Sequence, residues 1–347
     1  SPVLKVNMSE PFNAETPAPL LTDHYTTPTD IFYIRNHLPV PEVDPNDYVL
    51  EVSGEGLVPT RLTLDDLKTK FEQRTVVATL QCTGNRRSEL QAIKPIKGLA
   101  WSVGAIGNAE WRGVQLRDVL LYAGLKDLDF DGHVHFEGLD RNSATGECYG
   151  ASVPARTVLD SHGDCLLAYA MNGEDLTRDH GYPLRVVVPG ITGARNVKWL
   201  SKVRTSKEEY GGFWQQRDYK SFPPSVDWDT VDFSKAPAIQ ETPVQSAICS
   251  PQDGSALPAG VGSVTLRGYA YSGGGRGIIR VDVSADGGKT WHEASLREGV
   301  GQDPYRAWAW VLWDANVPLP VAGTPREMDG GCEQQRVELC CRAVDRS

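Results

Sequence analysis

The sequence contains no apolar run long enough to cross a membrane as a helix, which would need about 18 residues or more. It also has no internal repeat and no low-complexity tract. Hydrophobic residues fill 40% of the 347 positions and charged residues 23%, so the chain can bury a core and does not belong to the disordered class. We therefore expect a folded protein without a membrane span.

Positive charge is scarce. Lysine and arginine number 35 against 45 aspartates and glutamates, which gives a formal net charge of -10. A chain with this balance repels nucleic acid, so we expect no nucleic-acid partner. Any site for a small anion must then be built from local clusters of arginine and lysine. The length exceeds what one hydrophobic core usually holds and favours two domains.

The cysteines show neither the spacing of a zinc site nor that of a disulfide framework. No C-x-x-C occurs, and no Cys/His pattern has metal-ligand spacing. This usage is typical of a reducing compartment. The odd set of seven consists of Cys82, Cys148, Cys165, Cys249, Cys332, Cys340 and Cys341.

One of these cysteines, Cys82, stands beside concentrated positive charge. The β-branched run 74–80 predicts a buried strand, and a Gly-Asn turn ends it. Arg86 and Arg87 follow at once. A thiolate at this position can bind a soft metal while the guanidinium groups attract an anion. The alternative is a packed core thiol with the arginines in surface ion pairs.

Three further segments bring polar residues into loops. Residues 31–37 end in Arg-Asn-His after an aromatic run, and residues 179–185 join a histidine-containing turn to a strand. Residues 190–199 follow that strand with glycines, two cations and an asparagine, a composition that lets backbone N–H groups approach a phosphate. The plainer alternative is a hydrogen-bonded turn histidine and a solvated strand edge. Together the segments favour an anion site.

The hydrophobic pattern changes near residue 235 and divides the chain in two. Residues 1–235 mix strands with short helices, whereas short alternating segments separated by Gly/Asp turns predominate from residue 243, which is typical of a β-sandwich. We place the boundary in the segment 225–243. The pattern predicts strands at 47–53, 134–138, 184–189, 263–271, 278–284 and 307–313, helices at 63–70 and 117–124, and a hairpin turn at 285–291.

A series of motifs follows one order along nearly the whole chain: 12–15, 32–41, the Cys82 segment, 136–140, 167–173, 178–181, 185–190, 193–199 and 243–248. Together they resemble the eukaryotic sulfite oxidases and their relatives, the assimilatory nitrate reductases. The resemblance implies an α+β protein. A mixed α/β molybdenum-pterin catalytic domain (1–235) would precede an all-β, immunoglobulin-like dimerisation domain (236–347).

The resemblance also implies a cofactor, molybdenum held by the dithiolene of molybdopterin, with Cys82 as the only protein ligand to the metal. The residues implied to hold the pterin and its phosphate are Tyr33, Ile34, Arg35, Asn36, His37, Asp140, His180, Arg185, Asn196, Val197 and Lys198. Haem b would be a further cofactor only if the parent protein carries a cytochrome b5 domain, which this chain does not contain.

Residues 92–101 and 214–220 resemble the sulfite oxidases more closely than the nitrate reductases. The implied reaction is oxidation of sulfite to sulfate by oxygen-atom transfer from Mo(VI)=O, which leaves Mo(IV) to be reoxidised in one-electron steps. A dianion needs charge-assisted donors, and a hydroxyl can bond the oxygen that is transferred. The implied catalytic residues are Cys82, Arg35, Arg87, Trp101, Tyr219 and Lys97.

Two alternative functions remain. A nitrate reductase domain would take oxygen from nitrate, and Tyr219 speaks against it. A cofactor-free binding or scaffold protein, built on the sandwich domain, would contain no molybdenum.

Partners and location follow only from the resemblance. We expect a homodimer through the second domain. The family continues beyond the motif 341–345 into a final strand and a further pocket arginine, so we expect this domain to be truncated or to have an unusual end. An animal-like parent, suggested by 37–41 and 65–68, would reside in the mitochondrial intermembrane space and reduce cytochrome c through a haem domain. A plant-like parent would be peroxisomal and use dioxygen.

Overall fold

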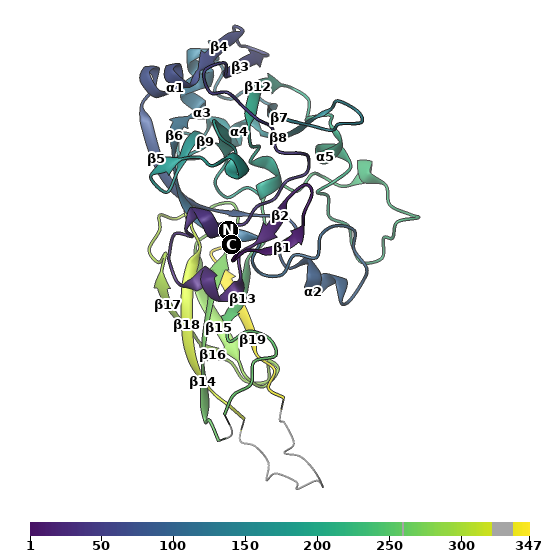
Figure 1. Ribbon diagram of the computed structural model, residues 1–347, viewed down its shortest axis with the longest axis vertical. Helices are drawn as coiled ribbons and strands as arrows, with labels where there is room; N and C mark the ends of the chain where they lie inside the picture. The colour runs from purple at the N-terminus through teal and green to yellow at the C-terminus, as the bar shows by residue number, and fades with distance from the viewer. Residues whose placement is uncertain (259, 321–335) are drawn as a thin grey trace.

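The computed structural model describes residues 1–258, 260–320 and 336–347. Figure 1 shows a long molecule with a mixed domain at one end and a β domain at the other, and both chain ends lie near the middle. The predicted α+β class with a C-terminal sandwich is therefore confirmed. Among the described residues, no helix has the length and apolar character needed to span a membrane.

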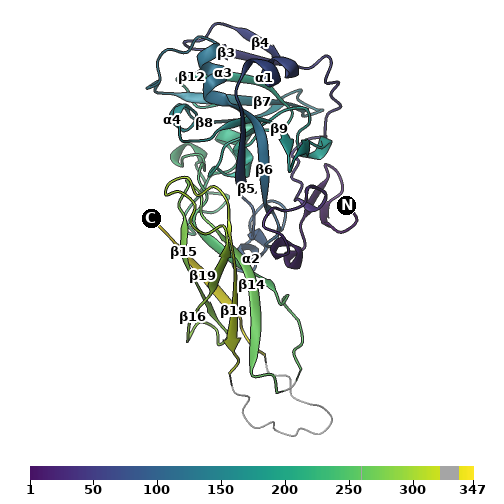
Figure 2. The ribbon, with the colours of Figure 1, turned by 90° about the vertical axis from the view of Figure 1, so that its left-hand side faces the viewer.

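Two sheets of five strands form the framework of the mixed domain, and Figure 2 shows them at the upper end of the molecule. The first has the order β10 (Glu174–Asp175), β9 (Leu166–Met171), β6 (Ile106–Gln115) and β5 (Gln73–Gln81), with β11 (Arg185–Val187) also paired to β9. The second has the order β4 (Thr60–Thr63), β3 (Val49–Gly54), β12 (Leu200–Ser206), β7 (His133–Arg141) and β8 (Cys148–Pro154). The predicted strands in this part of the chain are confirmed, although β11 is shorter than expected.

Alternation along β7 carries a charged side chain into the interior. Val134, Phe136, Gly138 and Asp140 are all buried, while the residues between them are only partly so. Because successive residues on a strand face opposite sides, these four share the face that packs on the core. The same period that buries Phe136 therefore also buries a carboxylate.

The helices are short. The five α-helices are α1 (Leu64–Lys70), α2 (Arg87–Gln91), α3 (Leu116–Tyr122), α4 (Ala155–Leu159) and α5 (Phe213–Gln216) among the described residues. The 3-10 turns are η1 (Ala18–Thr22), η2 (Thr29–Ile31), η3 (Arg178–His180), η4 (Gly193–Arg195) and η5 (Phe233–Lys235). Both predicted helices are confirmed. Thr63 caps α1, and Gly124 adopts a φ of 101° just after α3, as a residue that ends a helix must.

The C-terminal domain is a sandwich of a four-stranded and a three-stranded sheet. Val281 and Trp313 lie in the core between the sheets. The predicted turn at 285–291 is confirmed, because the Asp286 carboxylate accepts backbone N–H groups of this turn. The strands are β13 (Gln245–Ser250), β14 (Ser263–Tyr271), β18 (Val311–Pro318) and β17 (Ser295–Glu298) in one sheet, and β16 (His292–Glu293), β15 (Ile278–Ser284) and β19 (Cys340–Asp345) in the other. A separate hairpin, β1 (Lys5–Met8) and β2 (Asn13–Glu15), lies near the N-terminus.

A hydrophobic cluster joins the two domains. It combines Leu21 of η1 and Ile106 of β6 with Tyr269, Trp310 and Leu312 of the sandwich. The rings of Tyr269 and Trp310 stack at a centroid distance of 5.5 Å. Burial of this much apolar and aromatic surface fixes the sandwich against the end of β5.

The predicted strand at 307–313 is wrong in its first half, because β18 begins only at Val311. The backbone of the preceding residues bonds to the other domain. The Thr79 N–H donates to the Trp308 carbonyl at 2.9 Å, and the Trp310 N–H donates to the Thr79 hydroxyl at 2.8 Å. Alternating tryptophans therefore mark a domain contact here, and periodicity alone does not distinguish it from a sandwich strand.

We expect Thr63→Ala to lower the free energy of unfolding by about 1 kcal/mol, because the Thr63 hydroxyl accepts the Asp66 N–H and the Asp66 carboxylate accepts the Thr63 N–H. Urea denaturation followed by circular dichroism measures the change. Thr69→Ala in the same helix is the control, since the Thr69 hydroxyl only bonds back to the Asp65 carbonyl. An equal loss in both variants would contradict the capping role.

Candidate active site

Cys82 follows β5 directly and is buried, with 4% of its surface exposed. Its N–H donates to the Ala105 carbonyl at 2.9 Å, and its carbonyl accepts the Asn85 N–H at 2.9 Å, which closes the predicted turn. The Gly84 N–H lies 3.4 Å from the Cys82 sulfur. The turn thus holds the sulfur at the wall of a cavity with a backbone donor beside it.

Asn85 ties this turn to the sandwich domain. Its buried amide donates to the Tyr269 hydroxyl at 2.9 Å and accepts the Ala105 N–H at 3.0 Å. The Tyr269 hydroxyl in turn donates to the Val103 carbonyl at 2.9 Å. The position of Cys82 therefore depends on the contact between the domains.

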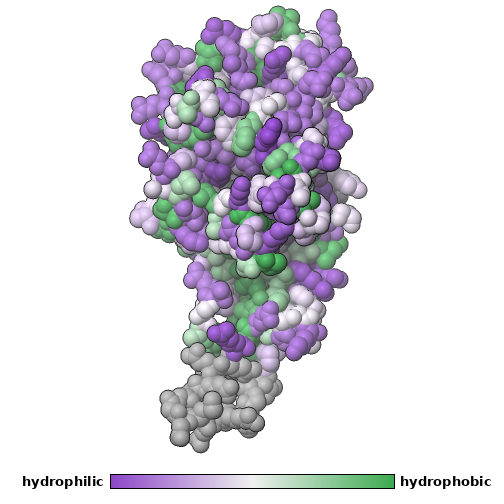
Figure 3. Space-filling model, turned by 90° about the vertical axis from the view of Figure 1, so that its right-hand side faces the viewer, coloured by the Kyte–Doolittle hydropathy of each residue, from purple (hydrophilic) through white to green (hydrophobic). Residues whose placement is uncertain are grey.

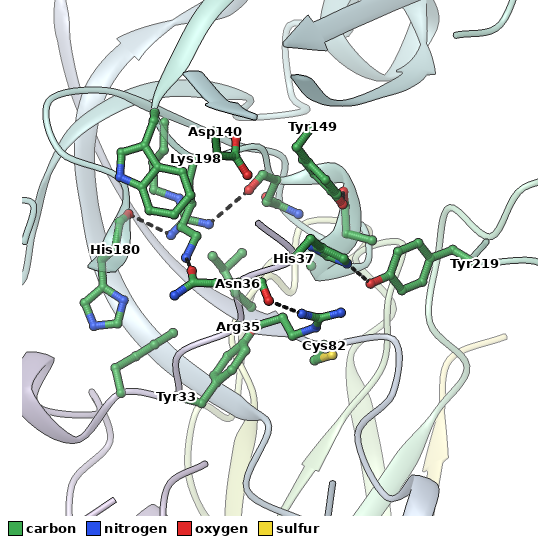
Figure 4. A pocket seen from close by; sticks show the side chains of 17 residues that line it. Tyr33, Arg35, Asn36, His37, Cys82, Asp140, Tyr149, His180, Lys198 and Tyr219 are labelled. Atoms are coloured by element: carbon green, nitrogen blue, oxygen red, sulfur yellow. Dashed lines mark hydrogen bonds between the residues drawn. The ribbon is translucent and has the colours of Figure 1, made fainter. Parts of the chain in front are cut away.

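The cavity gathers most of the predicted site residues. Figure 4 shows Arg35 extending past Asn36 towards Cys82, with Tyr219 on the same side, while Lys198, His180 and Asp140 lie at the other side. The lining residues are Phe32, Tyr33, Arg35, Asn36, His37, Leu80, Cys82, Asp140, Tyr149, His180, Arg185, Gly193, Ala194, Asn196, Lys198, Trp199 and Tyr219. Residues distant in sequence thus meet at one site.

Residues 33–37 follow η2 as the loop that the sequence predicted, without a helix. Asn13 of β2 holds this loop, because its side-chain oxygen accepts the Asn36 N–H at 2.9 Å and an Arg35 N–H at 3.2 Å. Its amide donates to the Asn36 carbonyl at 3.0 Å. Ile34 pairs with Ala14 and packs in a small apolar cluster, so its side chain does not line the cavity.

Two cations from the segments after β9 line the other side. Arg185 is 5% exposed and donates to the carbonyls of His180 at 3.0 Å and Asn196 at 3.2 Å. The Lys198 ammonium donates to the Asp179 carbonyl at 2.8 Å and to the Asn36 side chain. Within the described residues, neither cation forms an ion pair with a carboxylate within 4.0 Å. In the described part of the chain their charge is met by neutral oxygens and by the rings of Trp111 and Trp199.

Burial and crowding of like charge act on the titratable groups. Burial, together with the Arg185 charge, lowers the pKa of Lys198 to about 7. Burial also raises the pKa of Asp140 to about 7, although Lys198 opposes that change. The pKa of His180 falls to about 3, chiefly through burial and then through Lys198. All three shifts disfavour the charged form, which is chiefly the effect of burial; neighbouring positive charge adds to the shifts of Lys198 and His180 and opposes that of Asp140.

On the Cys82 side, His37 and Tyr219 form a pair, with the His37 Nε2 hydrogen-bonded to the Tyr219 hydroxyl. The His37 ring stacks on Tyr149 at a centroid distance of 4.5 Å. Burial raises the pKa of Tyr219 to about 12. The phenol therefore keeps its proton at neutral pH.

Three predicted substrate residues lie behind or outside the lining. Arg87 donates to the Leu99 carbonyl at 2.9 Å, and Trp101 is fully buried with its indole N–H unpaired in the described part of the chain. Lys97 is exposed and lies 4.0 Å above the Trp228 ring. Val197, predicted to contact the pterin, packs in the main core of the mixed domain. Their proposed roles remain predictions.

Two glycines make room for the Arg87 guanidinium. A Cβ at Gly84 would lie 2.6 Å from one of its nitrogens, and a Cβ at Gly98 would lie 2.7 Å from another. Gly98 also has a φ of 114°, which favours glycine. The guanidinium is therefore held close to the turn that carries Cys82.

Sequence reasoning missed Tyr149, and it gave Arg195 only as one of the two cations of the glycine-rich segment 190–199. The Tyr149 hydroxyl donates to the Ala194 carbonyl at 2.7 Å, and no motif distinguishes this residue within its strand. Arg195 is fully buried, donates to the carbonyls of Ile239 at 3.1 Å and Trp214 at 3.2 Å, and lies 5.7 Å from the Tyr219 ring centroid. It therefore supports the residues around Tyr219 from behind the cavity lining.

The chain matches two family models, an oxidoreductase molybdopterin binding domain at residues 37–214 and a Mo-co oxidoreductase dimerisation domain at residues 236–347. It is 46% identical to a sulfite oxidase of Arabidopsis thaliana over 99% of this chain and 86% of that protein. The chain belongs to the sulfite oxidase family of molybdopterin-binding oxidoreductases. Molybdenum with molybdopterin is the cofactor of this domain.

Within this family the chain is more similar to the sulfite oxidases than to a nitrate reductase. It is 53% identical to the mitochondrial sulfite oxidase of Mus musculus over 100% of this chain, which spans only 61% of that protein. A nitrate reductase of Hordeum vulgare is 36% identical over 91% of this chain and 37% of its own length. Among solved structures, the sulfane dehydrogenase SoxCD of Paracoccus pantotrophus superposes with a TM-score of 0.75 at 29% identity, covering 96% of this chain and 76% of that one.

The residues present fit the cofactor. The Nε of Arg185 and one carboxylate oxygen of Asp140 are buried without a hydrogen-bond partner in the described part of the chain, and these are a donor and an acceptor that a phosphate and a pterin edge can satisfy. No cluster of three or more His, Cys, Asp or Glu side chains among the described residues could hold a metal ion. Among the described residues that line the cavity, Cys82 alone carries a sulfur, the soft ligand suited to molybdenum.

We expect Lys198→Met to remove a pH dependence from the stability of the cofactor-free protein. The folded pKa of Lys198 is about 7 against its usual 10.5, so between these values the unfolded chain binds more protons and stability rises with pH. From about pH 7 to about pH 8.5 the wild type should gain about 1 kcal/mol over the variant. Urea denaturation at both pH values measures this gain.

Lys202→Met, which removes an exposed lysine that pairs with Glu137, is the control and should keep the wild-type slope. A wild-type slope in Lys198→Met as well would contradict the assignment.

Proposed function

We propose that this protein oxidises sulfite to sulfate at a molybdenum centre that Cys82 ligates, and that the electrons leave in one-electron steps. The observation that carries the proposal is the cavity in which Cys82, Arg35 and Tyr219 converge beside cations that lack a carboxylate partner. The identity to sulfite oxidases over the full chain supports the choice of substrate. The chain spans less than two thirds of the mouse relative, so the proposal concerns the molybdenum and dimerisation domains.

The protein side chains divide the work of binding. Lys198, Arg185 and the loop of Asn196 would hold the pterin phosphate, with Tyr33, Asn36, Asp140 and His180 around the pterin. The chemistry supplied by the bound molybdenum centre is oxygen-atom transfer and uptake of an electron pair. Sulfite and water together give sulfate, protons and this electron pair.

Substrate binding falls to the Cys82 side of the cavity. Arg35 would donate charge-assisted hydrogen bonds to the sulfite oxygens, and the Tyr219 hydroxyl, protonated at neutral pH, would donate another. Arg87, whose charge reaches Tyr219, would add a second positive group, with Trp101 buried behind the lining and Lys97 exposed outside it. Donors fixed before the substrate arrives do not have to reorganise during the reaction.

The dimerisation domain supports a homodimer. Figure 3 shows an apolar area on one side of the sandwich, a surface suited to a second copy of the chain. The relatives named mitochondrial support a mitochondrial location. The intermembrane space, with cytochrome c as the final acceptor, is a finer proposal that follows from the family resemblance alone, as does the alternative of a peroxisome and dioxygen for a plant-like protein.

The test is sulfite-dependent reduction of ferricyanide by protein whose molybdenum content is known, with nitrate-dependent oxidation of a reduced dye run in parallel. We expect sulfite turnover in proportion to molybdenum and no nitrate turnover. Nitrate turnover alone would assign the protein to the nitrate reductases. If the protein contains molybdenum and neither assay shows turnover, both reactions are contradicted. A protein that takes up no molybdenum would favour the alternative of a cofactor-free scaffold protein.

We expect Cys82→Ser to lower sulfite turnover by more than about 100-fold, because a hydroxyl is a poor substitute for a thiolate on a soft metal. The pterin content, measured by fluorescence after release, should stay near the wild-type value, since the proposed phosphate contacts lie on the other side of the cavity. Cys148→Ser on β8 is the control for loss of a thiol. Full activity in Cys82→Ser would exclude the ligand role.

A further inference from the structure

The hydroxyl of Tyr219 is hydrogen-bonded to the His37 ring, and the Arg35 guanidinium lies beside it. Tyr219 lies in a loop with a φ of 50°, held at its carbonyl by the Ile239 N–H at 2.8 Å. These contacts fix the backbone of Tyr219 but not the direction in which its hydroxyl points. The ring nitrogen of His37 supplies that restraint.

Aromatic side chains fix the His37 ring in turn. Tyr149 stacks on it with an interplanar angle of 21°, and the Trp214 ring meets it edge-on at 6.1 Å. Tyr149 is itself anchored through its bond to Ala194, and Trp214 through the Arg195 contact to its carbonyl. The imidazole can therefore neither tilt nor swing away without disturbing a packed cluster.

A histidine suits this position better than a carboxylate. Burial, and then the charges of Arg35, Lys198 and Arg195, hold the pKa of His37 well below its usual value, so the ring is neutral. A carboxylate beside Tyr219 would place negative charge next to the oxyanion and would compete for Arg35. A neutral imidazole orients the phenol without either cost.

We propose that His37 is a positioning residue that orients the Tyr219 hydroxyl towards the bound oxyanion. This role differs from the pterin contact that family resemblance implied for His37. It rests on the proposed function, in which Tyr219 binds the substrate. His37 would act on the affinity for the oxyanion and not on loading of the cofactor.

The experiment is a double-mutant cycle in the whole chain loaded with molybdenum cofactor. His37→Asn, whose amide reaches only the near ring nitrogen position, is combined with Tyr219→Phe. His37→Gln, whose amide reaches the position of Nε2, serves as the conservative variant. Each variant is characterised by its KM and kcat for sulfite, by the dissociation constant of sulfate from calorimetry, and by its molybdenum and pterin content.

We expect His37→Asn to weaken sulfate binding and raise KM by roughly tenfold, the loss of a hydrogen bond between neutral groups. His37→Gln should recover most of this loss. In the Tyr219→Phe background His37→Asn should have no further effect, because the hydroxyl it orients is absent. Cofactor content should equal that of the wild type in every variant.

Additive losses in the double variant, a loss in His37→Gln equal to that in His37→Asn, or a fall in cofactor content would each overturn the positioning role. Absence of sulfite turnover in the wild type would instead contradict the proposed function. In that case the double-mutant cycle is measured with the dissociation constant of sulfate. Failure of the positioning role is therefore distinguishable from failure of the proposed function.

Discussion

Positive charge without a matching carboxylate is the constraint on which the rest of the site depends. Arg35, Arg185 and Lys198 line one cavity, and among the described residues Asp140 is the only carboxylate in its wall. Burial and the Arg185 charge lower the pKa of Lys198 to about 7, so part of the positive charge can leave as a proton before an anion enters. A phosphate would reverse that pressure and contribute to stability, so cofactor binding and folding of this region are coupled.

The domain contact is the second requirement, since it determines where the thiol lies. Cys82 is at the end of β5, and the same strand end bonds to the sandwich through Thr79, while Asn85 bonds to Tyr269. A sandwich that merely tethered two subunits would not need polar bonds to the turn that carries the proposed metal ligand. The structure makes the sandwich part of the scaffold of the candidate site.

Sequence patterns predicted the parts of this arrangement that are local. The strand before Cys82, the capped helix after Thr63 and the hairpin at 285–291 each depend on neighbouring residues, and each is confirmed. Composition suggested that segments 31–37, 179–185 and 190–199 share an anion site, but the place of Tyr219 beside them came only from family resemblance, because no local rule brings residues 33–37 beside 219. The tryptophans at 308 and 310 misled for the same reason: their partner, Thr79, is distant in the sequence. Tyr149 and Arg195 act through packing, which periodicity does not reveal.

The division of charge inside the cavity bears on why a sulfite-binding site can coexist with a phosphate site. Figure 4 shows Lys198 and His180 on one side, and Arg35 extending to Cys82 and Tyr219 on the other, with Asn36 between them. Arg185 belongs to the first side, because it donates to the His180 carbonyl. A phosphate bound on the first side would neutralise the nearby cations and leave Arg35, supported by Arg87, to attract the second anion. The neutral pair of His37 and Tyr219 then adds direction without adding charge. An empty phosphate side would instead draw the substrate anion away from the metal, so loading of the cofactor is itself a condition for correct substrate placement.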